Sequence, residues 1–164
     1  MSLISKWLRS RKNQCTECGA AMRLATIASC HGAHNNVSVW LDGLPYLECE
    51  SGAHPKREPI SDFAQRLIEE IYINDQIPWA ELGALSGAKC LSCKTRLDAA
   101  GYENGEIGGE ISIDDLPAFR ARIQAMVIQC PACGTGQLLP DAIDVRDVDA
   151  AIRDALRSTG IVFS

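Results

Sequence analysis

The chain has 164 residues, and Leu, Ile, Val and Phe make up 39 of them, about 24%, which is enough for a folded core. The formal net charge of −5 does not favour a protein that binds polyanions through bulk charge. No apolar run approaches the ~18 residues of a membrane span, and residues 1–12 lack the apolar stretch of a signal peptide. We therefore expect a cytoplasmic protein.

The first 14 residues form a segment of their own in composition. They contain Lys6, Arg9, Arg11 and Lys12 and no acidic residue, and their apolar residues have helical spacing. This pattern predicts an N-terminal amphipathic basic helix over 1–14. The helix either packs on the rest of the chain or acts as a basic arm for an acidic partner.

Residues 15–76 predict a first zinc-ribbon-like lobe. We expect a strand over 22–28, a polar turn over 31–36 and a second strand over 37–48. Asp42-Gly43 suggests a bulge or kink in the second strand. A helix follows, with Ser61 or Asp62 as its cap and apolar residues on one side through position 72.

Residues 77–89 predict a linker, and residues 90–164 a second zinc-ribbon-like lobe. The Gly- and Glu-rich run 101–109 has the composition of a loop or hairpin tip, and apolar residues at 107, 111 and 113 suggest a strand. An inserted helix is predicted from position 114 or 115, because Phe119, Ile123, Met126 and Val127 fit one helical face. A last helix is predicted after Asp144, with Gly160 as its stop. The expected fold class is small α+β, with two tandem lobes of knuckle, β-hairpin, knuckle and helix.

Eight cysteines are the most informative feature of the composition. Six of them form three Cys-x2-Cys pairs, a spacing that lets two thiolates of one tight turn reach one metal ion. Without an export signal a disulfide framework is not expected. The sequence therefore predicts two zinc ions per chain.

The ligands of the second site follow almost by elimination. After position 54 the chain has no Cys or His other than Cys90, Cys93, Cys130 and Cys133. Two Cys-x2-Cys turns make a four-thiolate tetrahedral site, and four protein ligands leave no position for water. This predicts structural rather than catalytic zinc.

The first site needs two partners for Cys15 and Cys18. If residues 19–29 run away from the metal as a strand, their far end lies roughly 30 Å off, and the returning strand brings back Cys49 and then His54. We therefore predict Cys15, Cys18, Cys49 and His54. The alternative is a finger-like set in which Cys30 and His34 complete the site. In that alternative His34 would be the fourth ligand, whereas in the preferred set Cys30, His31 and His34 lie at the hairpin tip with no assigned role.

Residues 13–72 resemble the YgiT-type zinc finger, the zinc module of some bacterial antitoxins. The resemblance rests on the run Cys-Thr-Glu-Cys-Gly at 15–19 and on the segment from Val37 through Gly-Leu-Pro to Cys49. The family has a second Cys-x2-Cys where this chain has Gly52, so His54 would have to substitute. The chain shows no helix-turn-helix of the kind that follows the antitoxin module. The resemblance implies a zinc module that binds a partner protein, while residues 88–140 resemble a generic zinc ribbon, a fold shared by many functions.

These features predict a non-catalytic, zinc-stabilised module for protein–protein interaction or regulation, of bacterial type. One alternative is a nucleic-acid-binding zinc ribbon of transcription or translation. A four-thiolate zinc site adds about −2 and a three-thiolate site with a neutral His about −1, so the total charge becomes about −8 and disfavours this alternative. The other alternative is a thiol–disulfide oxidoreductase that uses a Cys-x2-Cys pair.

Overall fold

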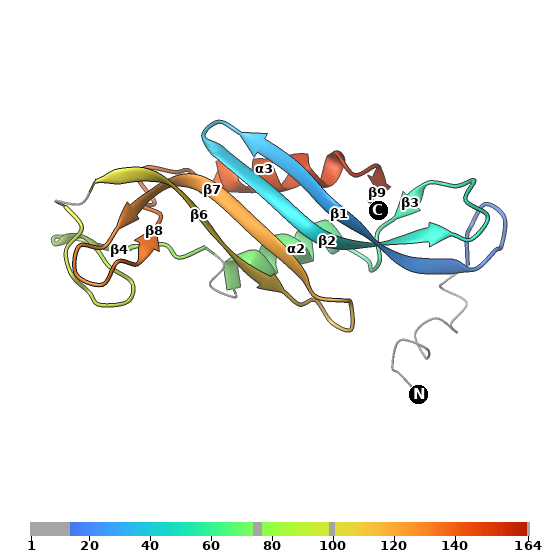
Figure 1. Ribbon diagram of the computed structural model, residues 1–164, viewed down its shortest axis with the longest axis horizontal. Coiled ribbons are helices and arrows are strands. Elements are labelled where there is room, and N and C mark those ends of the chain that lie inside the picture. Colours follow the sequence, from blue (N-terminus) through green and yellow to red (C-terminus); the bar gives the residue numbers. More distant parts are fainter. Residues whose placement is uncertain (1–13, 74–76, 99–100, 164) are drawn as a thin grey trace.

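The computed structural model describes residues 14–73, 77–98 and 101–163, and the predicted helix over 1–14 lies almost entirely outside them. The described chain is an α+β fold in which most strands join one seven-stranded sheet. Two helices, α2 (Phe63–Ile73) and α3 (Val145–Arg157), pack on this sheet (Figure 1). The predicted α+β class is thus confirmed. No helix in the described residues is long and apolar enough to cross a membrane.

The first hairpin consists of β1 (Met22–His34) and β2 (Val37–Cys49), paired antiparallel from Met22↔Cys49 to His34↔Val37. The turn is shorter than the predicted 31–36, because Cys30 and His31 still pair with Leu41 and Trp40 in the ladder. Only residues 35 and 36 connect the strands. The predicted strand over 22–28 was confirmed, but β1 continues to His34 through residues whose polar composition had suggested a turn.

The second strand of this hairpin changes direction at Gly43, which has a φ of 78° that other residues rarely adopt. The pairing register with β1 is the same on both sides, so no extra residue is inserted and Gly43 makes a kink rather than a bulge. Before the kink β2 pairs with another strand over Ser38–Asp42, and after it Leu47 pairs with Arg57 of β3 (Lys56–Arg57). The edge of β2 that faces away from β1 therefore has one partner strand before the kink and a different partner strand, β3, after it.

The second hairpin consists of β6 (Tyr102–Ile111) and β7 (Phe119–Gln129). The predicted loop over 101–109 and the predicted helix from position 114 were both wrong. Phe119, Ile123 and Val127 are four residues apart, a spacing that fits a helix as well as a strand of period two. Ala121 and Ala125 complete an alternating buried series from Phe119 to Val127 in β7, and their small side chains gave no signal in the sequence.

The two hairpins form one sheet, because β2 pairs antiparallel with β7 from Ser38↔Gln124 to Asp42↔Arg120. The two-lobe arrangement is therefore not confirmed, and the boundaries predicted at 15–76, 77–89 and 90–164 stay a prediction. The hairpins run in opposite directions, so their open ends lie at opposite ends of the long axis (Figure 1). Three short strands lie at the open end of the second hairpin. One of them, β8 (Gly136–Gln137), pairs with β7 in the large sheet. The other two, β4 (Glu81–Gly83) and β5 (Gly87–Lys89), pair with each other in a separate small sheet. A last strand, β9 (Ile161–Val162), runs parallel to β3.

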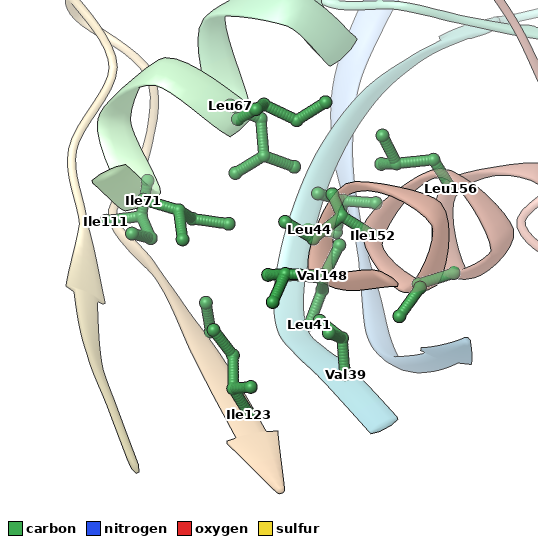
Figure 2. Close-up of a cluster of buried hydrophobic side chains, with 14 of the residues drawn as sticks. Val39, Leu41, Leu44, Leu67, Ile71, Ile111, Ile123, Val148, Ile152 and Leu156 are labelled. Carbon is green, nitrogen blue, oxygen red and sulfur yellow. The ribbon is translucent and has the colours of Figure 1, made fainter. Parts of the chain in front are cut away.

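Each helix packs against the hairpin of the other half of the chain. Helix α3, which follows the second hairpin, packs against β1 and β2, and α2, which follows the first, contacts β6 and α3. Figure 2 shows labelled side chains of both helices, such as Leu67 of α2 and Ile152 of α3, gathered around Leu44 of β2 in one core cluster. The helices predicted after Ser61 or Asp62 and after Asp144 were confirmed as α2 and α3, and the Asp144 side chain caps α3. The Phe63 N–H of α2 donates to Glu58, at 3.3 Å.

Helix α3 approaches β1 most closely at Gly32. A Cβ atom at this position would lie 2.0 Å from the backbone nitrogen of Ala155 and 2.3 Å from the Ala151 carbonyl oxygen. Any side chain would push the helix away, so the glycine sets the distance between α3 and the sheet. Ala151 and Ala155 are themselves fully buried, as small residues must be at such a contact.

Candidate metal centres

The three Cys-x2-Cys pairs adopt the same backbone turn. In each, the carbonyl of the first cysteine accepts an N–H four residues on, from Gly19, Lys94 and Gly134, at 2.8–2.9 Å. The N–H of the first cysteine donates to the carbonyl five residues on. The residue after the second cysteine has a positive φ in every case, which explains glycine at two of the three positions. The turn directs both sulfur atoms to one point.

The second group contains Cys90, Cys93, Cys130 and Cys133, whose sulfur atoms all lie within 4.8 Å of one another. The backbone of Pro78 and Ala80 bonds to Leu138 next to β8, which joins the segment before the Cys90 turn to the segment after the Cys130 turn. Within the first of these segments, the Leu97 N–H donates to Ala88 of β5 and closes the Cys90 turn. The Cys90 turn is thereby held beside the Cys130 turn, which continues from β7.

The distances in the second group fit a tetrahedral metal ion. Cys90 Sγ lies 3.6 Å from Cys133 Sγ, and Cys93 Sγ lies 3.5 Å from Cys130 Sγ. Four sulfur atoms at the zinc–sulfur distance of ~2.3 Å would be roughly 3.8 Å apart in a tetrahedron. The residues present therefore fit a closed four-thiolate site, and a disulfide, with sulfurs ~2.05 Å apart, is not what these separations describe.

Polar side chains surround these sulfurs, and the sequence analysis did not identify them. The hydroxyl groups of Thr95 and Thr135 lie 3.2 Å and 3.1 Å from Cys93 and Cys133, each two residues after its cysteine. Gln137 is completely buried, and its amide Nε2 donates to Cys90 Sγ at 3.2 Å. Its carbonyl oxygen accepts the Leu91 N–H at 2.5 Å. The repeated Cys-x-Thr spacing was the available signal, while Gln137 had none.

These contacts favour the ionised thiolate, the form that binds a metal, at Cys90 and Cys93. Burial opposes ionisation of Cys90, but the backbone N–H groups of Cys93 and Ser92 bond to its sulfur, and the net effect lowers the pKa of Cys90 to about 6. The Thr95 hydroxyl lowers the pKa of Cys93 in the same way.

The first group contains Cys15, Cys18, Cys49 and His54, whose ligand atoms also lie within 4.8 Å of one another. Cys18 Sγ lies 3.6 Å from Cys49 Sγ. Cys49 ends β2 directly opposite Met22, so the hairpin register brings it back to the Cys15 turn, as expected.

The turn at Cys49 differs from the other three. Gly52, at the position of a second cysteine, has a φ of 69°, and its N–H donates to the Cys49 carbonyl three residues earlier. The chain then needs two more residues before His54 can reach the group. The Ser51 hydroxyl lies 3.0 Å from Cys49 Sγ and lowers the pKa of Cys49.

The finger-like alternative does not assemble, because Cys30 and His34 lie at the far end of β1. Cys30 is buried among the residues beneath α3, where burial raises its pKa to about 11. The His31 ring lies 4.7 Å from the Trp40 ring, and His34 lies 3.7 Å from an oxygen of Asp147 in α3. These three side chains therefore point to different surroundings and form no common group.

Comparisons of the chain with protein-family models, with curated proteins and with solved structures give no significant match. The resemblance of residues 13–72 to the YgiT-type zinc finger therefore stays a hypothesis.

Proposed function

We propose that this protein binds two structural zinc ions and acts as a rigid module for protein–protein interaction or regulation. The convergence of four ligand atoms in each group, within 4.8 Å, is the observation that carries the proposal. Zinc matches this donor set because it prefers thiolate and imidazole ligands in a tetrahedral arrangement. Four protein ligands leave no open position for a substrate.

The position of the two groups explains why metal is needed there. Each group lies at the open end of a long hairpin, away from the main hydrophobic core, and is packed against a small apolar cluster only. Four buried residues, Cys15, Met22, Leu47 and Cys49, form the cluster at the first end, and the second cluster has five. Such small clusters bury too little apolar surface to hold hairpin ends on their own.

The two alternatives fit the structure less well. An oxidoreductase needs a Cys-x2-Cys pair that is free to form and break a disulfide, whereas all six of these cysteines belong to four-ligand groups. A nucleic-acid-binding ribbon needs positive charge, and the total of about −8 with two zinc ions opposes it.

The test is elemental analysis of protein purified without added metal. We expect close to two zinc ions per chain, with few titratable thiols in the folded protein. A stable, folded chain without metal would refute the proposal. Tight sequence-specific binding of DNA or RNA at physiological salt would move the protein to the nucleic-acid class instead.

A further inference from the structure

Strand β6 forms one long edge of the large sheet. Among residues 14–73, 77–98 and 101–163, only those of β7 pair with β6, over ten consecutive positions. The opposite long edge differs, because α3 packs against β1 and the Asp154 carboxylate accepts the Ala33 N–H at 3.1 Å. The outward N–H and C=O groups of an edge strand are a template for another strand.

The usual protection of an edge strand is missing from β6. Edges are commonly protected by lysine, by proline or by a bulge. Strand β6 has no lysine and no proline, and all ten of its residues pair with β7 in one unbroken register. Its charged residues are glutamates, and one of them, Glu106, already pairs with Arg122 of the same chain at 3.6 Å. The charge of this edge is thus partly neutralised within the sheet.

The sequence of β6 is complementary to itself in one antiparallel register. A twofold axis that joins two sheets with their helices on the same side pairs residues of the same face, so it passes through a single residue. With the axis at Ile107, residues 103–111 pair with residues 111–103, and no glutamate faces a glutamate. An axis at 106 places Glu106 opposite itself, and an axis at 108 places it opposite Glu110, which like-charge repulsion disfavours. An axis at 105 pairs only residues 102–108.

The side chains match in the register centred on Ile107. On the open face, the Asn104 amide faces the Glu110 carboxylate of the second copy, and the reverse contact forms by symmetry. On the face toward the helices, Gly105 faces Gly109, so no bulky side chains collide. Ile107 is half-buried against the core and faces its own counterpart on the axis, which removes more of its apolar surface from water.

Gly108 makes room for a contact across the joined edges. It lies directly opposite Arg122 of β7, and a Cβ there would lie 2.2 Å from the Ala121 carbonyl oxygen, so the position stays without a side chain. In this register Glu106 of the second copy faces Gly108. Its carboxylate can extend across the glycine toward Arg122, whose backbone lies two strands away, about 10 Å. Arg122 is held for this contact by Asp42, at 2.8 Å.

We propose that β6 is a dimerisation edge, at which two copies of this chain pair antiparallel about a twofold axis at Ile107 and form one continuous sheet. Main-chain hydrogen bonds along the edge supply affinity, and the facing side chains select the register. This inference goes beyond the proposed function, because self-association through β6 requires neither a partner protein nor a particular metal.

The first experiment measures the mass of the full chain, as purified, by sedimentation equilibrium from about 1 µM to about 0.5 mM. We expect a mass that rises to twice that of one chain. Over the same range, exchange of β6 amides with deuterium, measured by NMR, should slow, while exchange of β1 amides stays constant. A monomer throughout, or a dimer in which β6 exchange does not change, would overturn the proposal.

Two variants then locate the axis and the register. Ile107→Lys places two lysines opposite each other on the axis and should weaken the dimer by about tenfold or more. Asn104→Asp places a carboxylate opposite Glu110 at two symmetric positions and should weaken it about fivefold. The control Asn36→Asp makes the same change of charge at an exposed position of the β1–β2 turn and should have an effect below about twofold.

The exposed position of Asn104 keeps the test decisive if Ile107→Lys does not fold. Equal weakening by Asn104→Asp and Asn36→Asp would show a general effect of net charge and would overturn the register. A folded Ile107→Lys variant with unchanged dimer affinity would overturn the edge itself.

Discussion

The two ends of the molecule solve the same problem with different amounts of local structure. At the second end, two Cys-x2-Cys turns with the same hydrogen-bond pattern supply all four ligands, and Thr95, Thr135 and Gln137 bond to three of the sulfurs. At the first end one such turn faces a shorter turn at Cys49, and His54 replaces the missing cysteine.

The two sites differ in how their ligands are brought into position. The turns of the second end fix pairs of sulfurs locally, so that only the contact between the two turns depends on the fold. At the first end the third ligand is positioned by the register of a hairpin with two thirteen-residue strands, and the fourth by an irregular segment after it. The first end therefore depends more on the rest of the structure, and the following predictions test this difference.

The largest effect should come from loss of one ligand at the second end. We expect Cys130→Ser to reduce the metal content from two ions to one and to unfold the segment around β4, β5 and β8. Structural zinc contributes on the order of 10–16 kcal/mol to folding, so its loss exceeds what the small apolar cluster there can replace. Metal analysis and amide exchange measure this. A variant that still holds two ions would contradict the assignment.

The second prediction concerns the fourth ligand at the first end. His54→Ala should open one coordination position and lower zinc occupancy there, while the second end keeps its ion. His31→Ala and His34→Ala are the matched controls and should leave the zinc content at two. We expect a weakening larger than the 10- to 100-fold typical of residues around a metal site. Competition with a chelator would show it. A silent His54→Ala together with metal loss in His34→Ala would restore the finger-like set.

The third prediction tests the packing of α3 against the hairpin in the other half of the chain. Gly32→Ala should lower the free energy of unfolding by about 1–3 kcal/mol, because the added methyl group meets the backbone of α3. Gly101→Ala is the control, since nothing lies within 4 Å of a Cβ at that position. Urea denaturation of both variants measures the difference. Equal stabilities would mean that α3 does not press on β1.

The fourth prediction concerns the hydrogen bond from the Gln137 amide to Cys90 Sγ at the second end. Gln137→Leu removes the amide donor to Cys90 and leaves the Leu91 N–H without its acceptor. We expect zinc affinity at this end to fall about 10- to 100-fold, with no change at the first end. Gln124→Leu, on the exposed side of β7, should leave both affinities unchanged. Chelator competition at each end would show whether the loss is confined to one.

The smallest effect concerns the turn that lacks glycine. Lys94 has a φ of 63°, where Gly19 and Gly134 stand in the other two turns. Lys94→Gly should raise the free energy of unfolding by about 0.5–1 kcal/mol, reduced somewhat by loss of the exposed ion pair with Glu81. Lys94→Gln keeps the backbone strain and loses only the ion pair, so it should be slightly less stable than the wild type. Thermal unfolding of the three proteins separates the two contributions.

The features that depend on short-range spacing could be predicted from the sequence alone. The Cys-x2-Cys turns, the strands of the first hairpin, and helices α2 and α3 follow from local residue types and periods. The grouping of Cys49 and His54 with the first turn also followed, because an antiparallel hairpin returns the chain to its starting point. Zinc as the bound metal and two ions per chain stay predictions.

How the two halves of the chain pack together could not be predicted from local sequence patterns. Strand β7 was predicted as a helix, because Phe119, Ile123 and Val127 fit both periods and only the sheet selects one of them. Pairing of β2 with β7 and packing of each helix on the opposite hairpin join residues that are distant along the chain, and no local pattern encodes such contacts. The same holds for Gly32, whose role depends on a helix more than 100 residues away. Local propensities set the elements, and burial of their apolar faces against one another set the arrangement.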